Sequence, residues 1–333
     1  MGGKALNKYG VTTERKSTKD FHKIANYIQE KIGNDLELLT HVVKCYHRKD
    51  SHGDLDLLIQ IDVDYNINWR NYIEFTFKPK AIHNNGGVYS FDYEEFQIDF
   101  IPVKKSKWET AKVYYSYDPL GNCMGKTFHK FNLSYGWDGL YYKFRNFNGR
   151  LAENILITND PRKIFEFGGY DYDRYLQGFD DLDDIFKFVI DGKYFDTNVF
   201  KFENLNQIDR KRNRKRNTYH LFLGYIELLG DVKYPFHKDK DLYIPMIEEF
   251  FPEARLMEKL KELELLDKQN KILSQKFNGD IVMAWLPDLK GKELGHAINK
   301  FKFHLGNEYD DFIFNASYVE IYNRFMDIYE NYE

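Results

Sequence analysis

Residues 43–60, VKCYHRKDSHGDLDLLIQ, pass from a basic, polar run into an apolar one, and Asp54 and Asp56 stand at the transition. The leucine-rich half predicts a strand. Side chains two residues apart in a strand project from the same face, so we expect the two carboxylates side by side at an edge of a sheet. Neighbouring carboxylates raise each other's pKa unless a cation lies between them. Because Mg²⁺ binds one or two carboxylates together with substrate phosphates, the stretch predicts a magnesium site.

A third carboxylate follows in FQIDFIPV, residues 96–103, where Asp99 is flanked by Ile98 and Phe100 in what otherwise has the pattern of a buried strand. Three carboxylates on two adjacent strands can hold two Mg²⁺ or Mn²⁺ ions roughly 4 Å apart, an arrangement used for phosphoryl transfer. The alternative is that Asp54 and Asp56 are turn residues and Asp99 an edge residue. We predict that all three are catalytic metal ligands.

The composition limits the class of protein. The chain has 333 residues, is 43% hydrophobic and carries a net charge of −4. It therefore predicts a folded protein of two or three domains and excludes a globally basic nucleic-acid coat. Cys45 and Cys123 are its only cysteines, which excludes a disulfide framework and a cysteine-based zinc site. No apolar run is long enough to cross a membrane, so we expect no membrane partner and a cytoplasmic or nuclear location.

The N-terminal part has the pattern of an α+β fold, with a mixed or antiparallel sheet and helices on one face. Ser17 and Asp20 resemble a capping box, apolar residues follow at helical spacing, and Gly33 suits a helix end, so residues 17–33 predict a helix. Short β-branched or aromatic runs predict strands. The predicted strands are residues 36–44, 55–63 and 71–78, followed by one or two strands within 83–103 after a turn at 84–87.

The rest of the chain is predicted to be mostly helical. A helix over 123–131 and a short hairpin around 137–139 come first, and residues 159–230 and the leucine-rich stretch 254–277 have helical patterns. We expect three domains. They are an α+β catalytic domain over 1–150, a helical domain with a basic segment over 151–235, and a C-terminal helical domain over 236–333 that is a candidate for binding nucleic acid.

A basic run, RKRNRKR over residues 210–216, interrupts this mildly acidic chain with six basic residues in seven. On a helix they would surround most of the circumference, which suits contact with a polyphosphate backbone. The alternative is a solvated helix face neutralised by the acidic run at 180–184. The predicted nucleic-acid-binding residues are Arg210, Lys211, Arg212, Arg214, Lys215 and Arg216.

The run CYHRKDSHGDLDLLI resembles the nucleotide-binding and metal-binding segment of the DNA polymerase β superfamily of nucleotidyltransferases, family X polymerases included. Gly53, Asp54 and Asp56 match its pattern, and Asp99 fits its third catalytic aspartate. The resemblance implies a polymerase β-like domain that uses two Mg²⁺ or Mn²⁺ ions. It implies attack by a nucleic-acid 3′-hydroxyl on a nucleoside triphosphate with release of pyrophosphate. Arg48, Ser51 and Gly53 would hold the triphosphate.

Further segments carry weaker resemblances. GNCMGKTFHKFNLSYGWDGLYY, residues 121–142, resembles the polymerase helix that covers the incoming nucleotide, which implies that Asn122 and Lys126 face the base pair or primer. Residues 277–302 are similar to the C-terminal helices of CCA-adding tRNA nucleotidyltransferases. GGKAL near the start and residues 168–188 resemble nucleotidyltransferases of phages and large DNA viruses, which implies a viral protein working in the host cytoplasm or nucleus.

One part of the family pattern is missing. The Gly-Ser that opens the family's triphosphate-binding helix corresponds to Lys44-Cys45, and lysine does not permit the close backbone approach that glycine provides. Three functions therefore stay open. They are a DNA polymerase X-like enzyme, an RNA or tRNA 3′-end nucleotidyltransferase, and a catalytically dead nucleic-acid-binding protein.

Overall fold

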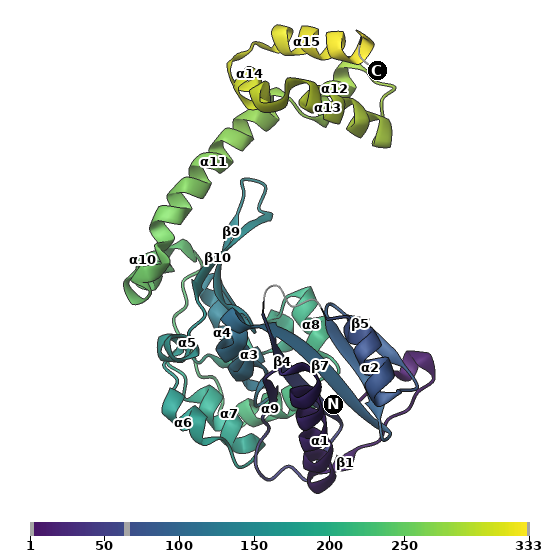
Figure 1. The fold of residues 1–333 in the computed structure, drawn as a ribbon. Coiled ribbons are helices and arrows are strands. Elements are labelled where there is room, and N and C mark those ends of the chain that lie inside the picture. Colours follow the sequence, from purple (N-terminus) through teal and green to yellow (C-terminus); the bar gives the residue numbers. More distant parts are fainter. Residues whose placement is uncertain (1–2, 63–66, 332–333) are drawn as a thin grey trace. The chain divides into compact units, whose positions relative to one another are not determined.

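A five-stranded sheet organises the N-terminal part of the chain, with the strand order β2-β4-β7-β6-β5 (Figure 1). The structure is a computed structural model that describes residues 3–62 and 67–331. β4 and β7 run parallel and the other neighbours are antiparallel, so the sheet is mixed and the predicted α+β class is confirmed. The strands are β2 (Thr40–Val42), β4 (Asp54–Ile61), β5 (Ile82–Asn85), β6 (Val88–Tyr93) and β7 (Phe96–Lys104).

One face of this sheet is covered by two helices, α1 (Thr18–Leu36) and α2 (Trp69–Phe77) (Figure 1). Their apolar side chains form one hydrophobic core with Leu55, Leu57 and Ile59 of β4. The three β4 residues alternate along the strand, so they share the face that points toward the helices. Burial of this face fixes the orientation of β4, because a strand turned over would place its charged residues in the core.

The opposite face is partly covered by α3 (Trp108–Tyr115), which packs on Leu58, Ile101 and Val103 of β4 and β7. The prediction of helices on one face only is therefore wrong. Near-continuous apolar stretches in both parallel strands are the physical reason, since a strand buried on both faces does not alternate strictly between polar and apolar residues.

The first predicted helix begins as expected and ends later than expected. The Ser17 hydroxyl accepts a hydrogen bond from the Asp20 backbone N–H at 3.2 Å, which confirms the predicted cap. Gly33 does not end the helix, which continues to Leu36. Glu37 adopts the left-handed conformation, with φ of 55°, and its N–H bonds the Gly33 carbonyl. A left-handed residue at this position satisfies the carbonyls of the last turn as glycine usually does.

The strand predicted over residues 71–78 is wrong, because residues 71–77 belong to α2 and Lys78 follows its end. Trp69, Ile73 and Phe77 are buried at four-residue spacing against the core, and the Asn68 side chain caps the helix by accepting from the Asn71 N–H. Their aromatic and β-branched composition favours a strand only weakly. Burial of one helical face overrides that preference.

Residues 83–103 form parts of three strands, β5, β6 and β7, where one or two were predicted. The predicted turn at 84–87 is confirmed as the β5–β6 hairpin, whose strands pair from Asn85 to Val88 outward. A second tight turn separates β6 from β7 and was missed. Glu94 and Glu95 both take positive φ there, of 50° and 61°, a conformation that the sequence does not announce.

After the central sheet the chain is mainly helical, as predicted. The helix predicted over 123–131 corresponds to α4 (Leu120–Phe128), and the predicted hairpin at 137–139 joins β8 to β9. β10 completes a small sheet in the order β10-β9-β8. The other elements are β1 (Lys16–Ser17), β3 (Ser51–His52), β8 (Leu133–Gly136), β9 (Gly139–Arg145), β10 (Leu151–Thr158), α5 (Pro161–Gly168), α6 (Tyr172–Gln177), α7 (Leu182–Ile190), α8 (Gln207–Asn213), α9 (Asn217–Glu227), α10 (Ile244–Phe250), α11 (Leu256–Lys276), α12 (Gly279–Trp285), α13 (Gly291–Leu305), α14 (Tyr309–Asn315) and α15 (Tyr318–Asn331).

The chain divides into two compact units. Unit 1 comprises Met1–Lys143 and Asn154–Leu256, and unit 2 comprises Phe144–Glu153 and Met257–Glu333. Unit 2 has its own core, to which α12 to α15 contribute. The three-domain division drawn from the sequence stays a prediction. Residue 63, the last of the strand predicted over 55–63, lies outside the described residues, and no helix among those described has the length and apolar character needed to cross a bilayer.

Candidate metal centre

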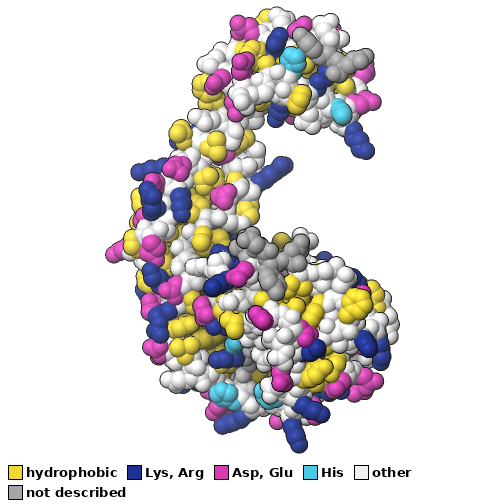
Figure 2. Space-filling model, in the orientation of Figure 1, with side chains coloured by type: hydrophobic (Ala, Val, Ile, Leu, Met, Phe, Trp, Pro, Cys, Tyr) yellow, Lys and Arg dark blue, Asp and Glu magenta, His cyan; other side chains and the backbone are white. Residues whose placement is uncertain are grey.

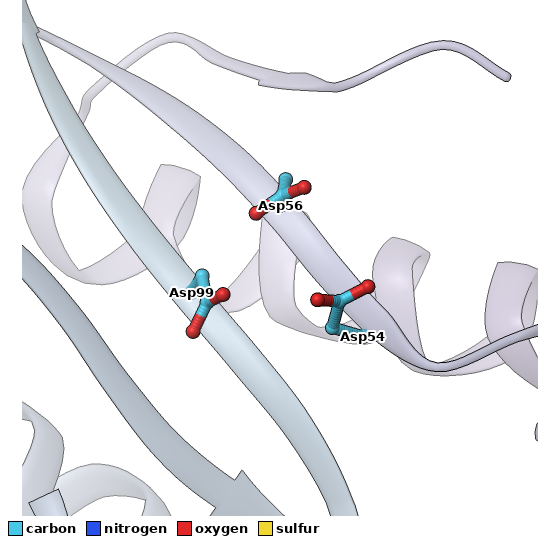
Figure 3. Close-up of side chains that lie close together, drawn as sticks. All are labelled: Asp54, Asp56 and Asp99. Atoms are coloured by element: carbon cyan, nitrogen blue, oxygen red, sulfur yellow. The ribbon is translucent and has the colours of Figure 1, made fainter. Parts of the chain in front are cut away.

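The parallel register of β4 and β7 brings the three predicted aspartates together. Asp56 lies opposite Asp99, and Asp54 lies opposite Gln97. Asp54 and Asp56 are two residues apart, so all three carboxylates project from the same face of the sheet, as Figure 3 shows. This is the face that α3 covers further along, and the carboxylates lie at the end where β4 and β7 begin.

The distances within the cluster suit a divalent cation. One oxygen from each carboxylate lies within 4.8 Å of the others, and each side chain is partly buried. The donors are all carboxylate oxygens, which Mg²⁺ and Mn²⁺ prefer over nitrogen or sulfur. Asp54, Asp56 and Asp99 therefore fit such an ion by both spacing and chemistry.

The electrostatics of the cluster point the same way. Burial raises the pKa of Asp56 well above its ordinary value, and the charges of Asp54 and Asp99 raise it further. Burial also raises the pKa of Asp54, and it raises the pKa of Asp99 to about 6 even though hydrogen bonds from Ser90 and Gln97 lower it. Among the described residues, no lysine or arginine forms an ion pair with these carboxylates. A bound cation would remove this repulsion.

Two cations nevertheless lie within electrostatic range. Lys49 lowers the pKa of Asp54 and Asp56, and Arg15 lowers that of Asp54, in both cases against the larger effect of burial. The Arg15 guanidinium is held on the neighbouring strand, donating to the Ser51 carbonyl at 2.6 Å and the Ser51 hydroxyl at 3.1 Å. Arg15 was not among the predicted site residues, because it lies 39 positions before Asp54 and is brought there by the pairing of β1 with β3.

The residues predicted to hold a triphosphate lie in different surroundings. Ser51 and Gly53 precede β4 directly and are close to the carboxylates in the chain. Arg48 instead forms ion pairs with Asp180 at 3.4 Å and Asp181 at 3.5 Å, and its side chain is 71% exposed. The triphosphate role of all three stays a prediction.

The segment that corresponds to the family's Gly-Ser forms no helix. Lys44 and Cys45 lie in an irregular stretch between β2 and β3. The Lys44 N–H donates to the Ser116 hydroxyl, and the Lys44 carbonyl accepts from the Tyr117 N–H at 2.8 Å. A helix N-terminus with free backbone N–H groups, the usual phosphate cradle, is therefore not formed by these two residues.

Asn122 and Lys126 are neighbours one turn apart on α4. The Lys126 ammonium donates to the Asn122 side-chain oxygen and lies 4.9 Å from the centre of the Tyr219 ring. Lys126 is only 5% exposed, and burial lowers its pKa. The predicted contact of this pair with a base pair or primer stays a prediction.

The basic run does not lie on one continuous helix. α8 ends at Asn213, Arg214 follows it, and Arg216 stands directly before α9, so the run spans a helix–helix junction. A hollow of about 710 Å³ is lined there by Gln207 and four basic side chains, those of Arg210, Lys211, Arg214 and Lys215. Figure 2 shows basic and acidic side chains interspersed over the visible face, so local concentration rather than total charge distinguishes this run.

The acidic run at 180–184 does not neutralise these basic residues. Asp180 and Asp181 pair with Arg48, and Asp184 pairs with Arg174 at 3.7 Å. In the described part of the chain, Arg216 is the member of the basic run that has an ion pair, with Asp118 at 3.4 Å. Burial raises the pKa of Tyr115, the charge of Asp56 raises it further, and the charge of Arg212 lowers it, so one residue of the basic run and one aspartate of the cluster both act on this phenol.

Comparison with known proteins gives little at the level of sequence. No protein-family model matches the chain, and no curated protein matches it. Among solved structures it is similar to Leishmania infantum polymerase beta in a ternary P/T complex, with a TM-score of 0.38 and 14% identity. That match covers 49% of this chain and 76% of the polymerase.

Proposed function

We propose that the α+β part of unit 1 is a polymerase β-like nucleotidyltransferase domain. Its reaction would transfer a nucleoside monophosphate from a nucleoside triphosphate to the 3′-hydroxyl of a nucleic acid. The observation that carries this proposal is the group of three partly buried carboxylates on the parallel strands β4 and β7, which form no ion pair with any described lysine or arginine. Carboxylates in this arrangement are used to hold two metal ions for phosphoryl transfer.

The three aspartates would divide the ligand positions. Asp54 and Asp56 would bind both ions, and Asp99 would complete the coordination of one. Two bound Mg²⁺ or Mn²⁺ ions would lower the pKa of the acceptor hydroxyl and neutralise charge on the phosphates. The hydroxyl oxygen would bond to the α-phosphorus, the bond to the β-phosphate would break, and pyrophosphate would leave while the hydroxyl proton passes to solvent. The protein would mainly position reactants and stabilise charge.

The triphosphate would be held on the β3 side of the carboxylates. Among the described side chains, Arg15 and Lys49 are cations within electrostatic range of Asp54, and Ser51 adds a hydroxyl beside Arg15. Guanidinium and ammonium groups bind phosphate oxygens strongly, which suits them to replace the missing helix N-terminus. Arg48 would join them by exchanging its exposed ion pairs with Asp180 and Asp181 for phosphate.

The acceptor strand would follow the basic run of α8 and the α8–α9 junction. Four of its exposed cations line one hollow, and a fifth, Arg212, acts on the pKa of Tyr115, as Asp56 does. Contacts of this kind hold a phosphate backbone without reading sequence. The candidate residues are Arg210, Lys211, Arg212, Arg214, Lys215 and Arg216, with Asn122 and Lys126 toward the paired base.

The experiment that tests the proposal offers the full chain labelled nucleotides and several acceptors. Primed DNA, single-stranded DNA and a tRNA transcript are each incubated with ribo- or deoxyribonucleotides and Mg²⁺ or Mn²⁺, and extension is read on a gel. Extension of DNA would support the polymerase X-like function. Extension of tRNA alone would support an RNA 3′-end transferase instead, the alternative suggested by the C-terminal resemblance.

A second candidate function is a nucleic-acid-binding protein that transfers no nucleotide. The irregular backbone at Lys44 and Cys45 favours it, because no helix N-terminus is formed there to cradle a triphosphate. Binding of DNA or RNA by gel shift, together with no extension of any acceptor under either metal, would support this function and contradict the transferase.

A further inference from the structure

The N-terminal segment lies against the candidate metal centre. Residues 3–6 are called the clasp here, and its last residue, Leu6, is fully buried. The Thr13 hydroxyl donates to the Gly3 carbonyl at 2.8 Å, which fixes the other end of the clasp. The clasp therefore runs alongside the beginning of β4 and β7. One of its contacts joins Ala5 to Gln97, which lies 92 positions later in the chain.

Gln97 connects the clasp to Asp99. Its side-chain oxygen accepts from the Ala5 N–H at 3.0 Å, and its side-chain nitrogen donates to the two Asp99 oxygens at 3.1 and 3.0 Å. The Gln97 side chain is buried, with 3% exposure. The Ala5 N–H can only donate, so the Gln97 side-chain oxygen must face it. The Gln97 NH₂ group is thereby directed to the Asp99 carboxylate.

Gly3 connects the clasp to the other strand. The Gly3 backbone lies beside Gly53, directly before Asp54, and it lowers the pKa of the Asp54 carboxyl against the larger effect of burial. Gly3 has a φ of +78°, and a Cβ atom at this position would lie 2.6 Å from the Gly53 carbonyl oxygen. A side chain there would be strained and would collide with backbone, so the close approach of Gly3 to the start of β4 requires glycine.

We propose that the clasp is part of the divalent-cation site, with Gly3 and Gln97 as positioning residues for Asp54 and Asp99. This inference rests on the metal centre of the proposed function and adds residues outside its carboxylates. Partners that donate to ligating carboxylates orient them and strengthen metal binding. Because linkage is reciprocal, a bound cation stabilises the docked clasp to the same degree.

The test measures Mn²⁺ affinity of the full chain by electron paramagnetic resonance, which needs no turnover. Gln97→Met keeps the length of the side chain and removes both hydrogen-bonding groups, so it should weaken Mn²⁺ binding by about 10–100-fold. Gly3→Ala should weaken it comparably. Gly10→Ala is the matched control, because Gly10 has a φ of +76° and no atom lies within 4 Å of the position that a Cβ would take, so it introduces similar strain without the collision.

Hydrogen exchange supplies a second readout that a purely structural role would not change. Mn²⁺ should slow exchange of the Ala5 amide by at least tenfold in the wild-type protein and have no effect in Gln97→Met. Wild-type Mn²⁺ affinity in folded Gln97→Met, or equal exchange of Ala5 with and without Mn²⁺, would overturn the clasp. If Gly3→Ala does not fold, Gln97→Met decides alone.

The failure of this inference differs from that of the proposed function. Mn²⁺ binding that is indifferent to Gln97 and Gly3 would remove the clasp and leave the transferase standing. Mn²⁺ binding that depends on the clasp, without nucleotide incorporation, would keep the clasp and remove the transferase. No Mn²⁺ binding by the wild-type protein would contradict both.

Discussion

The three aspartates of β4 and β7 and the acidic run of Asp180 to Asp184 both gather like charges in unit 1, but in opposite surroundings. Around Asp56 and Asp99, burial and mutual repulsion raise each pKa, and no described lysine or arginine pairs with them. In the acidic run, a hydrogen bond with His47 and the charge of Arg48 lower the pKa of Asp180. The first group destabilises the metal-free fold, whereas the second stabilises it.

This difference separates a functional charge cluster from a structural one. The acidic run has local tasks, since the Asp181 side chain caps α7 by accepting from the Asp184 N–H at 3.1 Å, and Asp180 and Asp181 pair with Arg48. Within the described ranges 3–62 and 67–331, the carboxylates of β4 and β7 form no ion pair. The proposed divalent cation would supply the opposite charge that this cluster lacks.

The largest expected effect concerns the three aspartates of β4 and β7. Asp99→Asn should lower nucleotide incorporation by about 10³-fold, because loss of a charged ligand removes several kcal/mol of charge stabilisation. Single-turnover incorporation measures the change, and circular dichroism checks the fold. Asp183→Asn, in the acidic run, is the matched control and should retain full activity. Undiminished incorporation by Asp99→Asn would end the three-aspartate model.

The next effect concerns the basic run, residues 210–216, with which the acidic run at 180–184 forms no ion pair among the described residues. Replacing Arg210, Lys211 and Lys215 together by alanine should weaken nucleic-acid binding by about tenfold or more at low salt and reduce the slope of log affinity against log salt by about 2 to 3. Fluorescence anisotropy over a salt series measures both. An unchanged slope would show that these side chains do not meet phosphates.

The two groups should respond in opposite directions to loss of a charge. Asp56→Asn should raise the free energy of unfolding of the metal-free protein by about 1–2 kcal/mol at pH 7, because it removes a repelled, desolvated carboxylate. Asp181→Ala should lower it by about 1 kcal/mol through loss of a helix cap. Urea titrations in EDTA measure both, and a loss of stability in Asp56→Asn would contradict the uncompensated cluster.

The smallest effect is the pH dependence of each group. The pKa of Asp99 in the folded chain is about 6 and its ordinary value is 3.8, so the unfolded chain ionises first. Its contribution to stability is therefore full below about pH 4 and is lost as the pH rises toward 6. The lowered pKa of Asp180 has the opposite sign, and its contribution is lost as the pH falls. Melting temperatures of Asp99→Asn and Asp180→Asn against wild type, in EDTA from about pH 2 to 7, separate the two, because the Asp99 effect changes above about pH 4 and the Asp180 effect below it.

The carboxylate pattern was the part of the site most accessible to sequence reasoning. Asp54 and Asp56 share a face because strand geometry has a period of two, and the apolar flanks of Asp99 mark its strand. The partner strand and its parallel register are properties of the folded sheet, which resemblance could suggest and spacing alone could not. The contacts of Gln97 with Ala5 and of Arg15 with Ser51 join segments far apart in the chain, so no local pattern announces them.

Other expectations failed where tertiary contacts override local preference. Residues 71–77 are helical because Ile73 and Phe77 complete a buried face with Trp69, although the composition of this stretch favours a strand. The charges of the two runs allow the acidic residues 180–184 to neutralise the basic residues 210–216. In the folded chain, Asp180 pairs with Arg48 and Asp184 pairs with Arg174, because tertiary structure brings these side chains together.

The register of β4 against β7 has a consequence for the fidelity of folding. If β7 slipped by one residue, Asp99 would turn to the face that packs against α1 and α2, and Ile98 or Phe100 would replace it beside Asp56. A misaligned chain would thus lose a ligand and bury a charge at once. A divalent cation would bind only the correctly aligned sheet. Its binding free energy would therefore stabilise the correct register of β4 and β7 over the shifted one.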